Sequence, residues 1–91
     1  MPQDFPPSIA KSAKDPSLEV SVRVGRGGIS EALVSELSDQ LRRKRLVKVK
    51  ANKGIAIDSS GRREIFESIA EATGSKLVFQ RGNVAVFWQS K

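Results

Sequence analysis

The stretch Val20-Ser21-Val22-Arg23-Val24-Gly25-Arg26-Gly27-Gly28-Ile29-Ser30 is the most informative part of this chain. Its valines alternate with Ser21 and Arg23, which predicts a half-buried strand. Three glycines in four positions predict a tight loop that a ligand can approach closely, because no Cβ atoms stand in the way. Ser30 is a good N-cap, so a helix is expected next, and the N-terminus of a helix favours phosphate.

The glycine loop is compatible with several kinds of site. Gly25 and Gly28 enclose Arg26 and Gly27 as a GxxG motif, a pattern that clamps the nucleic-acid backbone in some RNA-binding modules. A dinucleotide fingerprint is disfavoured, because position 30 is serine and no acidic residue ends the next strand. The chain also has no P-loop motif. A purely structural glycine turn before a helix stays open.

The positive charge is concentrated in the middle of the sequence. Residues 42–63 carry nine basic side chains and one acidic side chain, Asp58, whereas residues 1–41 have a net charge of −2 and residues 64–91 of 0. A localised basic segment on a small domain points first to nucleic acid. Two other interpretations of the basic segment remain. In one, the cations only stabilise the C-terminal end of a helix. In the other, the chain is an interaction module that binds an acidic protein.

Composition excludes several other classes. Cysteine and histidine are absent, which removes disulfides, thiolate zinc sites and the usual general base. Glu64, Glu67 and Glu71 follow Arg62 and Arg63 in a pattern typical of a solvated helix face. We therefore expect no enzyme, no metal and no cofactor. Without an apolar span or a secretory signal, a soluble cytoplasmic protein is expected.

Proline marks the start of the chain, since all four prolines stand within residues 1–17. We expect residues 1–17 to form a proline-rich arm that packs loosely, with a short helix over residues 8–14. Residues 18–91 are expected to form one domain.

Apolar spacing predicts two longer helices. The first begins at Ser30 and ends near residues 42–44. Its apolar face, which is expected to turn inward, consists of Leu33, Val34, Leu37 and Leu41. The second stops at Gly74 and buries Ile65, Phe66, Ile69 and Ala70. The aromatic residues Phe66, Phe79 and Phe87 are more typical of a core than of a base-stacking surface, and Trp88 is the best candidate for an exception.

The strands complete an α/β two-layer sandwich of order β-α-β-α-β-β. Residues 46–50 alternate as the second strand, and residues 76–80 and 84–89 flank a hairpin turn. Right-handed crossovers place both helices on one face of a four-stranded mixed sheet and leave the other face open. If the valines face the helices, that open face carries Arg23, Lys48 and Lys50.

Three segments with consistent spacing resemble the CRM domain family, and in particular its stand-alone, YhbY-like prokaryotic members. They are Val24–Ser30 for the glycine loop and helix start, Leu46-Val47-Lys48-Val49-Lys50 for a strand, and Ile69–Ser75 with Leu77-Val78 for a helix end and strand. The matches span about residues 20–88. The family loop usually reads G-x-N-G, and Gly27 stands here in place of the asparagine.

The resemblance implies a fold like the C-terminal domain of translation initiation factor three, with strand order 1-2-4-3 and the last strand antiparallel to the rest. It also implies binding to structured RNA, with ribosomal RNA or pre-ribosomal subunits as the expected partner. Together with the charge pattern, it predicts an RNA-binding site made of Gly25, Arg26, Gly27, Gly28, Arg23, Arg42, Arg43, Lys44, Arg45, Lys48 and Lys50. An Alba-type chromatin protein is the main rival, although the segments at 46–50 and 69–78 do not fit that family.

Overall fold

The computed structural model describes residues 6–25, 29–51 and 59–89, with seven elements of secondary structure. The helices are α1 (Pro7–Ala13), α2 (Glu31–Lys44) and α3 (Ser59–Thr73). The strands are β1 (Val20–Val24), β2 (Leu46–Ala51), β3 (Lys76–Arg81) and β4 (Val84–Trp88). The predicted order of strands and helices is therefore confirmed, and α1 corresponds to the short helix expected over residues 8–14.

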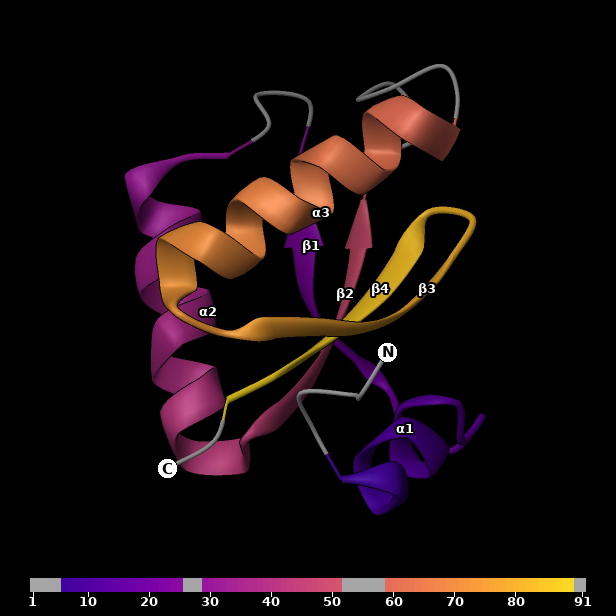
Figure 1. The fold of residues 1–91 in the computed structure, drawn as a ribbon. Helices are drawn as coiled ribbons and strands as arrows, with labels where there is room; N and C mark the ends of the chain where they lie inside the picture. The colour runs from indigo at the N-terminus through magenta and orange to yellow at the C-terminus, as the bar shows by residue number, and fades with distance from the viewer. Residues whose placement is uncertain (1–5, 26–28, 52–58, 90–91) are drawn as a thin grey trace.

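The four strands form one mixed sheet in the order β1-β2-β4-β3. β1 and β2 are parallel, and β4 pairs antiparallel with both β2 and β3. This is the strand order that the family resemblance implies. Figure 1 shows β1 and β2 running upward side by side, with α2 and α3 on one side of the sheet and α1 at its lower end.

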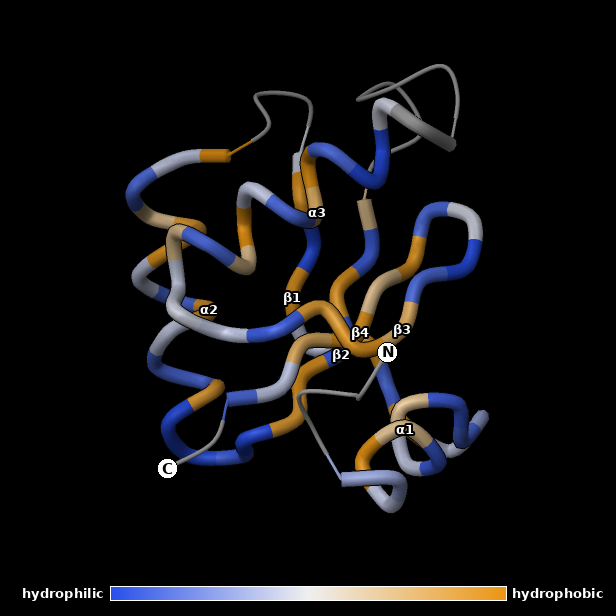
Figure 2. The backbone as a smooth tube through the Cα atoms, in the orientation of Figure 1, coloured by the Kyte–Doolittle hydropathy of each residue, from blue (hydrophilic) through white to orange (hydrophobic). Residues whose placement is uncertain are grey.

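The main core lies between the sheet and the pair α2 and α3. Alternation along each strand turns every second residue to this side, and Figure 2 shows the resulting change between hydrophobic and hydrophilic positions along β1 and β2. At its centre the rings of Phe66 and Phe87 meet edge to face, with centroids 6.2 Å apart. Both rings are completely buried, as predicted.

Local signals begin and end the helices where they were expected. The Ser30 hydroxyl accepts a hydrogen bond from the Leu33 N–H at 3.1 Å and caps α2. Gly74, with φ +70°, follows α3 in a Schellman arrangement, in which the Ser75 N–H donates to the Ala70 carbonyl at 2.9 Å. These caps satisfy backbone groups that a helix end leaves without partners.

One strand residue departs from the prediction. Simple alternation would turn Val20, Val22 and Val24 to the same face, but the register shifts between Val20 and Val22. Val22 and Val24 belong to the core, whereas Val20 pairs with Lys48 and is only half-buried. The bulge interrupts the simple alternation, which a sequence pattern of period two cannot reveal.

The two-layer arrangement of the sheet with α2 and α3 is confirmed, but the second face of the sheet is only partly open. α1 contacts β3 and β2, while α2 and α3 contact the sheet from the other side. Val86 of β4 alternates with the core residues Ala85 and Phe87, so it points to the second face, yet its exposure is 0%. Ala13 of α1 is also buried, at 1% exposure. α1 therefore covers part of this face.

The link between α1 and β1 is held by Asp15. Its carboxylate accepts hydrogen bonds from the Ser17 N–H at 2.9 Å and from the Ser17 hydroxyl at 2.8 Å. The backbone bond, followed by the hydroxyl bond, lowers the pKa of Asp15 below its usual value. The charged carboxylate accepts these bonds more strongly than the neutral acid does, so protonation of Asp15 in acid should weaken this turn.

Candidate nucleic-acid interface

The glycine loop begins at the end of β1, and the next described residue is Ile29, just before α2. Gly25 is exposed, and a Cβ atom added to it would meet nothing within 4 Å. The backbone of Gly25 is therefore open to an approaching ligand. The predicted site residues Arg26, Gly27 and Gly28 lie outside the described residues.

The N-terminus of α2 has part of its hydrogen-bonding capacity already in use. The Leu33 N–H donates to the Ser30 hydroxyl, and the Val34 N–H donates to the Ser30 carbonyl at 3.0 Å. Glu31 places an exposed carboxylate in the first turn. Because this carboxylate opposes the approach of an anion, α2 contributes less to phosphate binding than an uncapped helix start would.

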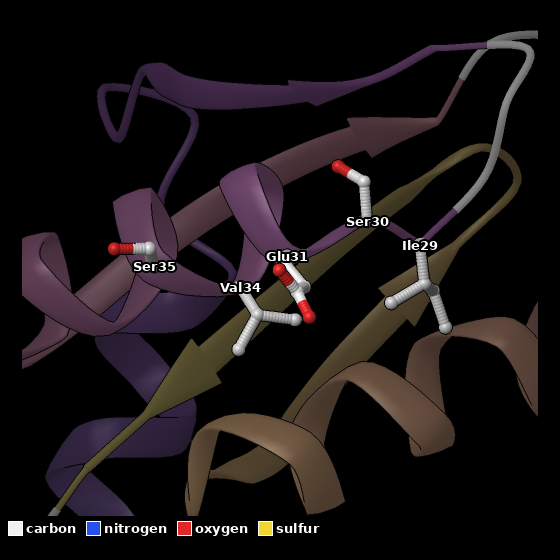
Figure 3. Close-up of a pocket in the computed structure, with 5 residues that line it drawn as sticks. All are labelled: Ile29, Ser30, Glu31, Val34 and Ser35. Carbon is white, nitrogen blue, oxygen red and sulfur yellow. The ribbon is translucent and has the colours of Figure 1, made fainter.

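An open groove of about 460 Å³ lies beside the start of α2. Ile29 and Val34 supply its apolar wall, and Ser30, Glu31 and Ser35 complete the described lining (Figure 3). Ile29 is 39% exposed and is the exposed large apolar side chain among the described residues. In the sequence, Ile29 is only part of the glycine loop, and its exposure is visible only in the structure.

Arg23 and Lys50 lie side by side on the second face, at the end of the sheet where the glycine loop begins. Their Cα atoms are register partners on the parallel strands β1 and β2, and both side chains are exposed. Neighbouring strands are about 4.8 Å apart, so the two cations present one local patch next to Gly25. The structure thus brings these three predicted residues together.

Lys48 occupies the same face but is partly engaged. Its Nζ donates a hydrogen bond to the Leu18 carbonyl at 3.1 Å, and the residue is half-buried. This bond ties the segment after α1 to β2. Lys48 is therefore less available to a ligand than Arg23 or Lys50.

A second group of cations stands at the other end of α2. We call this the helix-end group, and its four exposed members are Arg42, Arg43, Lys44 and Arg45. Arg42 pairs with Asp39, and the Lys44 Nζ lies 3.4 Å from the Ser21 hydroxyl oxygen. The group is close to the beginning of β1 and far from its end.

The predicted site is therefore divided into two parts. α2 has 14 residues, which corresponds to a length of about 20 Å. The helix-end group lies at the C-terminus of that helix, whereas Gly25, Arg23 and Lys50 lie near its N-terminus. The basic segment thus contributes cations at both ends of α2, because β2 runs back along the sheet from the end of α2 toward the glycine loop.

The remaining basic residues of the segment 42–63 belong to neither of these two groups. The Arg62 Nε donates to the Gly82 carbonyl at 3.1 Å and joins α3 to the hairpin between β3 and β4. Arg63 forms an ion pair with Glu67 at 3.7 Å. Lys53 and Asp58 lie outside the described residues.

Within residues 6–25, 29–51 and 59–89, no group of three or more histidine, cysteine or carboxylate side chains is arranged to hold a metal ion. The helices in the same part of the chain are too short or too polar to span a bilayer.

Fold and surface together define a small α/β domain with a capped glycine-loop helix and exposed cations at both ends. The model of the CRS1/YhbY (CRM) domain matches residues 12–89, and the chain belongs to this family. This confirms the resemblance found in the sequence.

A solved structure gives an independent comparison. The solution structure of the hypothetical protein SAV1595 from Staphylococcus aureus, described as a candidate RNA-binding protein, is similar with a TM-score of 0.66 and 28% identity. The similarity covers 92% of this chain and 79% of the other chain. No curated protein matches the sequence significantly.

Proposed function

We propose that this domain binds RNA, through the glycine loop and an exposed basic surface, and that it acts by binding rather than by catalysis. Membership of the CRM domain family carries the proposal. The similarity to a candidate RNA-binding protein supports it, as do the exposed cations near Gly25 and at the helix end. The family match also favours this function over that of an Alba-type protein.

The proposed binding mode uses each part of the loop differently. Gly25, Gly27 and Gly28 would let the RNA backbone approach, because a glycine has no Cβ atom. Arg26 would pair with a phosphate, and the N–H groups of Glu31 and Ala32 would add donors at the start of α2. The helix-end group, Arg23, Lys48 and Lys50 would attract the polyanion over a wider surface.

The double substitution Gly27→Asp with Gly28→Asp tests the loop. Two carboxylates at the proposed point of contact should abolish binding to purified ribosomal RNA, because they repel phosphate and block the approach of the backbone. Circular dichroism should show an unchanged fold. A filter-binding titration measures the affinity.

The matched control adds the same two charges elsewhere. Ser12 on α1 and Ala72 on α3 are exposed, so Ser12→Asp with Ala72→Asp lowers the net charge equally without touching the loop. The control should bind nearly as well as the unaltered protein. Normal binding by the glycine-loop variant would reduce the loop to a structural turn.

The finer proposal concerns the partner: ribosomal RNA or a ribosomal precursor in the cytoplasm. The family resemblance of the glycine loop, the second strand and the end of the second helix supports it. Sequencing the RNA that crosslinks to the protein in cells should recover ribosomal sequences, and the protein should sediment with ribosomal subunits. Enrichment of unrelated RNA, with no protein in the ribosomal fractions, would contradict this partner while leaving RNA binding intact.

A further inference from the structure

Three cations from three different strands form a row across the second face of the sheet. Arg23 pairs with Lys50, Lys50 pairs with Val84, and Val84 pairs with Arg81. Register partners point to the same side of a sheet, so Arg23, Lys50 and Arg81 lie on one line at the end where the glycine loop begins. We call these three residues the loop-end row.

All three side chains of the loop-end row are exposed. In the described part of the chain, none of the three forms an ion pair or a side-chain hydrogen bond, whereas Arg42, Arg63 and Arg62 are each held by a partner. Holding unpaired cations in a line costs electrostatic repulsion. Such an arrangement is suited to a ligand that carries several negative charges.

The dimensions indicate what kind of ligand fits. With strands about 4.8 Å apart, Arg23 and Lys50 are one strand apart, and Arg81 lies two strands beyond Lys50, so the row is about 14 Å long. With their backbone positions spread over this length, the three cations suit several phosphates better than a single phosphate group. A nucleic-acid strand, which repeats its phosphates along its length, can contact them one after another.

The surroundings of the row favour backbone contacts over base recognition. Val84, which lies between Lys50 and Arg81, is uncharged and half-buried. The aromatic residues Phe79 and Trp88 are paired with Val86 and Lys76, farther from the glycine-loop end of the sheet. Val86, in the next position toward α1, is already covered. The exposed chemistry of the row is thus guanidinium and ammonium, which bind phosphate without reading sequence.

The row is also continuous with the proposed loop site. Arg23 precedes Gly25 by two residues on β1, the edge strand of the sheet. Arg81 is at the far edge, beside the turn at Gly82, whose φ of +57° allows the tight hairpin. The Arg62 bond to the Gly82 carbonyl fixes this turn against α3 and so holds Arg81 in place.

We infer that the loop-end row of Arg23, Lys50 and Arg81 binds the phosphates of an RNA strand that crosses the second face of the sheet from the glycine loop to the β3–β4 hairpin. This inference rests on the proposed function. It adds Arg81 to the proposed RNA-binding residues and specifies the path of the RNA across the sheet. The helix-end group, at the other end of α2, is not part of this path.

The test compares Arg81→Gln with Arg63→Gln. Both substitutions remove one positive charge from an exposed arginine, but Arg63 lies on α3 and pairs with Glu67. Arg81→Gln should weaken binding to purified ribosomal RNA roughly three- to tenfold and reduce the slope of log K against log salt by about 0.7–1. Arg63→Gln should leave both quantities nearly unchanged. Lys50→Gln should reproduce the effect of Arg81→Gln, and it replaces that variant if Arg81→Gln fails to fold.

The outcomes separate this inference from the function itself. If the unaltered protein does not bind RNA, the proposed function fails. A second outcome is that the unaltered protein binds RNA and the variant with Gly27→Asp and Gly28→Asp does not. If Arg81→Gln and Lys50→Gln then keep the original affinity and slope, the RNA-binding role of the loop-end row is disproved while the proposed function stands. Equal weakening by Arg81→Gln and Arg63→Gln would also overturn the row, because it would reflect net charge alone.

Discussion

Arg45 ends α2 in a backbone conformation that usually belongs to glycine. Its φ is +67°, in the left-handed region, and its N–H donates to the Leu41 carbonyl at 2.8 Å. A side chain in this region costs about 1–2 kcal/mol because of the contact between Cβ and the backbone. The exposed guanidinium makes no ion pair within the described residues that would repay this cost. The proposed RNA-binding site includes Arg45, so its substitution tests whether the guanidinium contributes to binding.

Arg45→Gly and Arg45→Ala separate the two roles of this residue. Both substitutions remove the charge and should weaken RNA binding to a similar extent. Glycine relieves the strain and alanine keeps it, so Arg45→Gly should unfold with a free energy about 0.5–1 kcal/mol higher than Arg45→Ala. Urea denaturation and filter binding measure the two effects. A glycine variant less stable than the alanine variant would contradict the strain, and full binding by both would remove Arg45 from the interface.

Gly25 tests whether the loop glycine serves the fold or the ligand. Its φ is not in the left-handed region, and a Cβ atom would point into open space. Gly25→Ala should therefore leave the free energy of unfolding unchanged or raise it by about 0.4–1 kcal/mol, because the unfolded chain loses freedom. RNA binding should weaken, since the methyl group occupies space near the proposed phosphate position. A clear loss of stability would show that the glycine is required by the fold.

At the scale of elements, α1 changes what the second face can do. It covers Val86 and leaves the loop-end row exposed, so the face is divided into a covered part and a charged part. Lys48, between these parts, is bonded to the Leu18 carbonyl and helps to hold the segment that follows α1. The helix that precedes the β-α-β-α-β-β core thus limits where a ligand can lie.

A charge placed under α1 tests this packing. Ala13 is buried at 1% exposure, so Ala13→Asp should lower the free energy of unfolding by about 2 kcal/mol or more, because an unpaired carboxylate is buried or α1 leaves the sheet. Ser12→Asp, at the exposed neighbouring position, adds the same charge and should change stability by no more than about 0.5 kcal/mol. Thermal and urea unfolding measure both variants. Equal stability of the two variants would mean that α1 does not pack on the sheet.

At the scale of the whole molecule, exposed positive charge lies at two separate places, the loop-end row and the helix-end group. The loop-end row and the helix-end group are separated by about the length of α2, in a molecule whose longest extent is 32 Å. A ligand that contacts both must itself extend over much of the protein surface. This requirement suits a folded RNA better than a short peptide or a nucleotide.

The dependence of binding on salt measures how many phosphates the surface engages. If about six cations contact phosphates, log K should fall with log salt with a slope of roughly −4 to −5, steeper for a duplex than for a single strand. Titrations of ribosomal RNA at increasing potassium chloride concentration give this slope. A flat dependence would contradict the electrostatic model. Equal competition by an acidic polypeptide would favour an interaction with protein.

The sequence by itself determined the elements and most of the core. The Ser30 cap, the Gly74 stop and the burial of Phe66 and Phe87 follow from local hydrogen bonding and from apolar spacing, which act within a few residues. The motifs shared with the CRM domain family added the strand order, which periodicity does not contain.

Only the tertiary structure decided which of the predicted residues meet. Strand register places Arg81 in line with Arg23, and the bulge near Val20 shifts one valine off the core. The length of α2 separates the helix-end group from Gly25, and the packing of α1 covers Val86. The reason is physical: these relations depend on hydrogen bonds and contacts between segments far apart in the chain, which leave no periodic trace in the sequence.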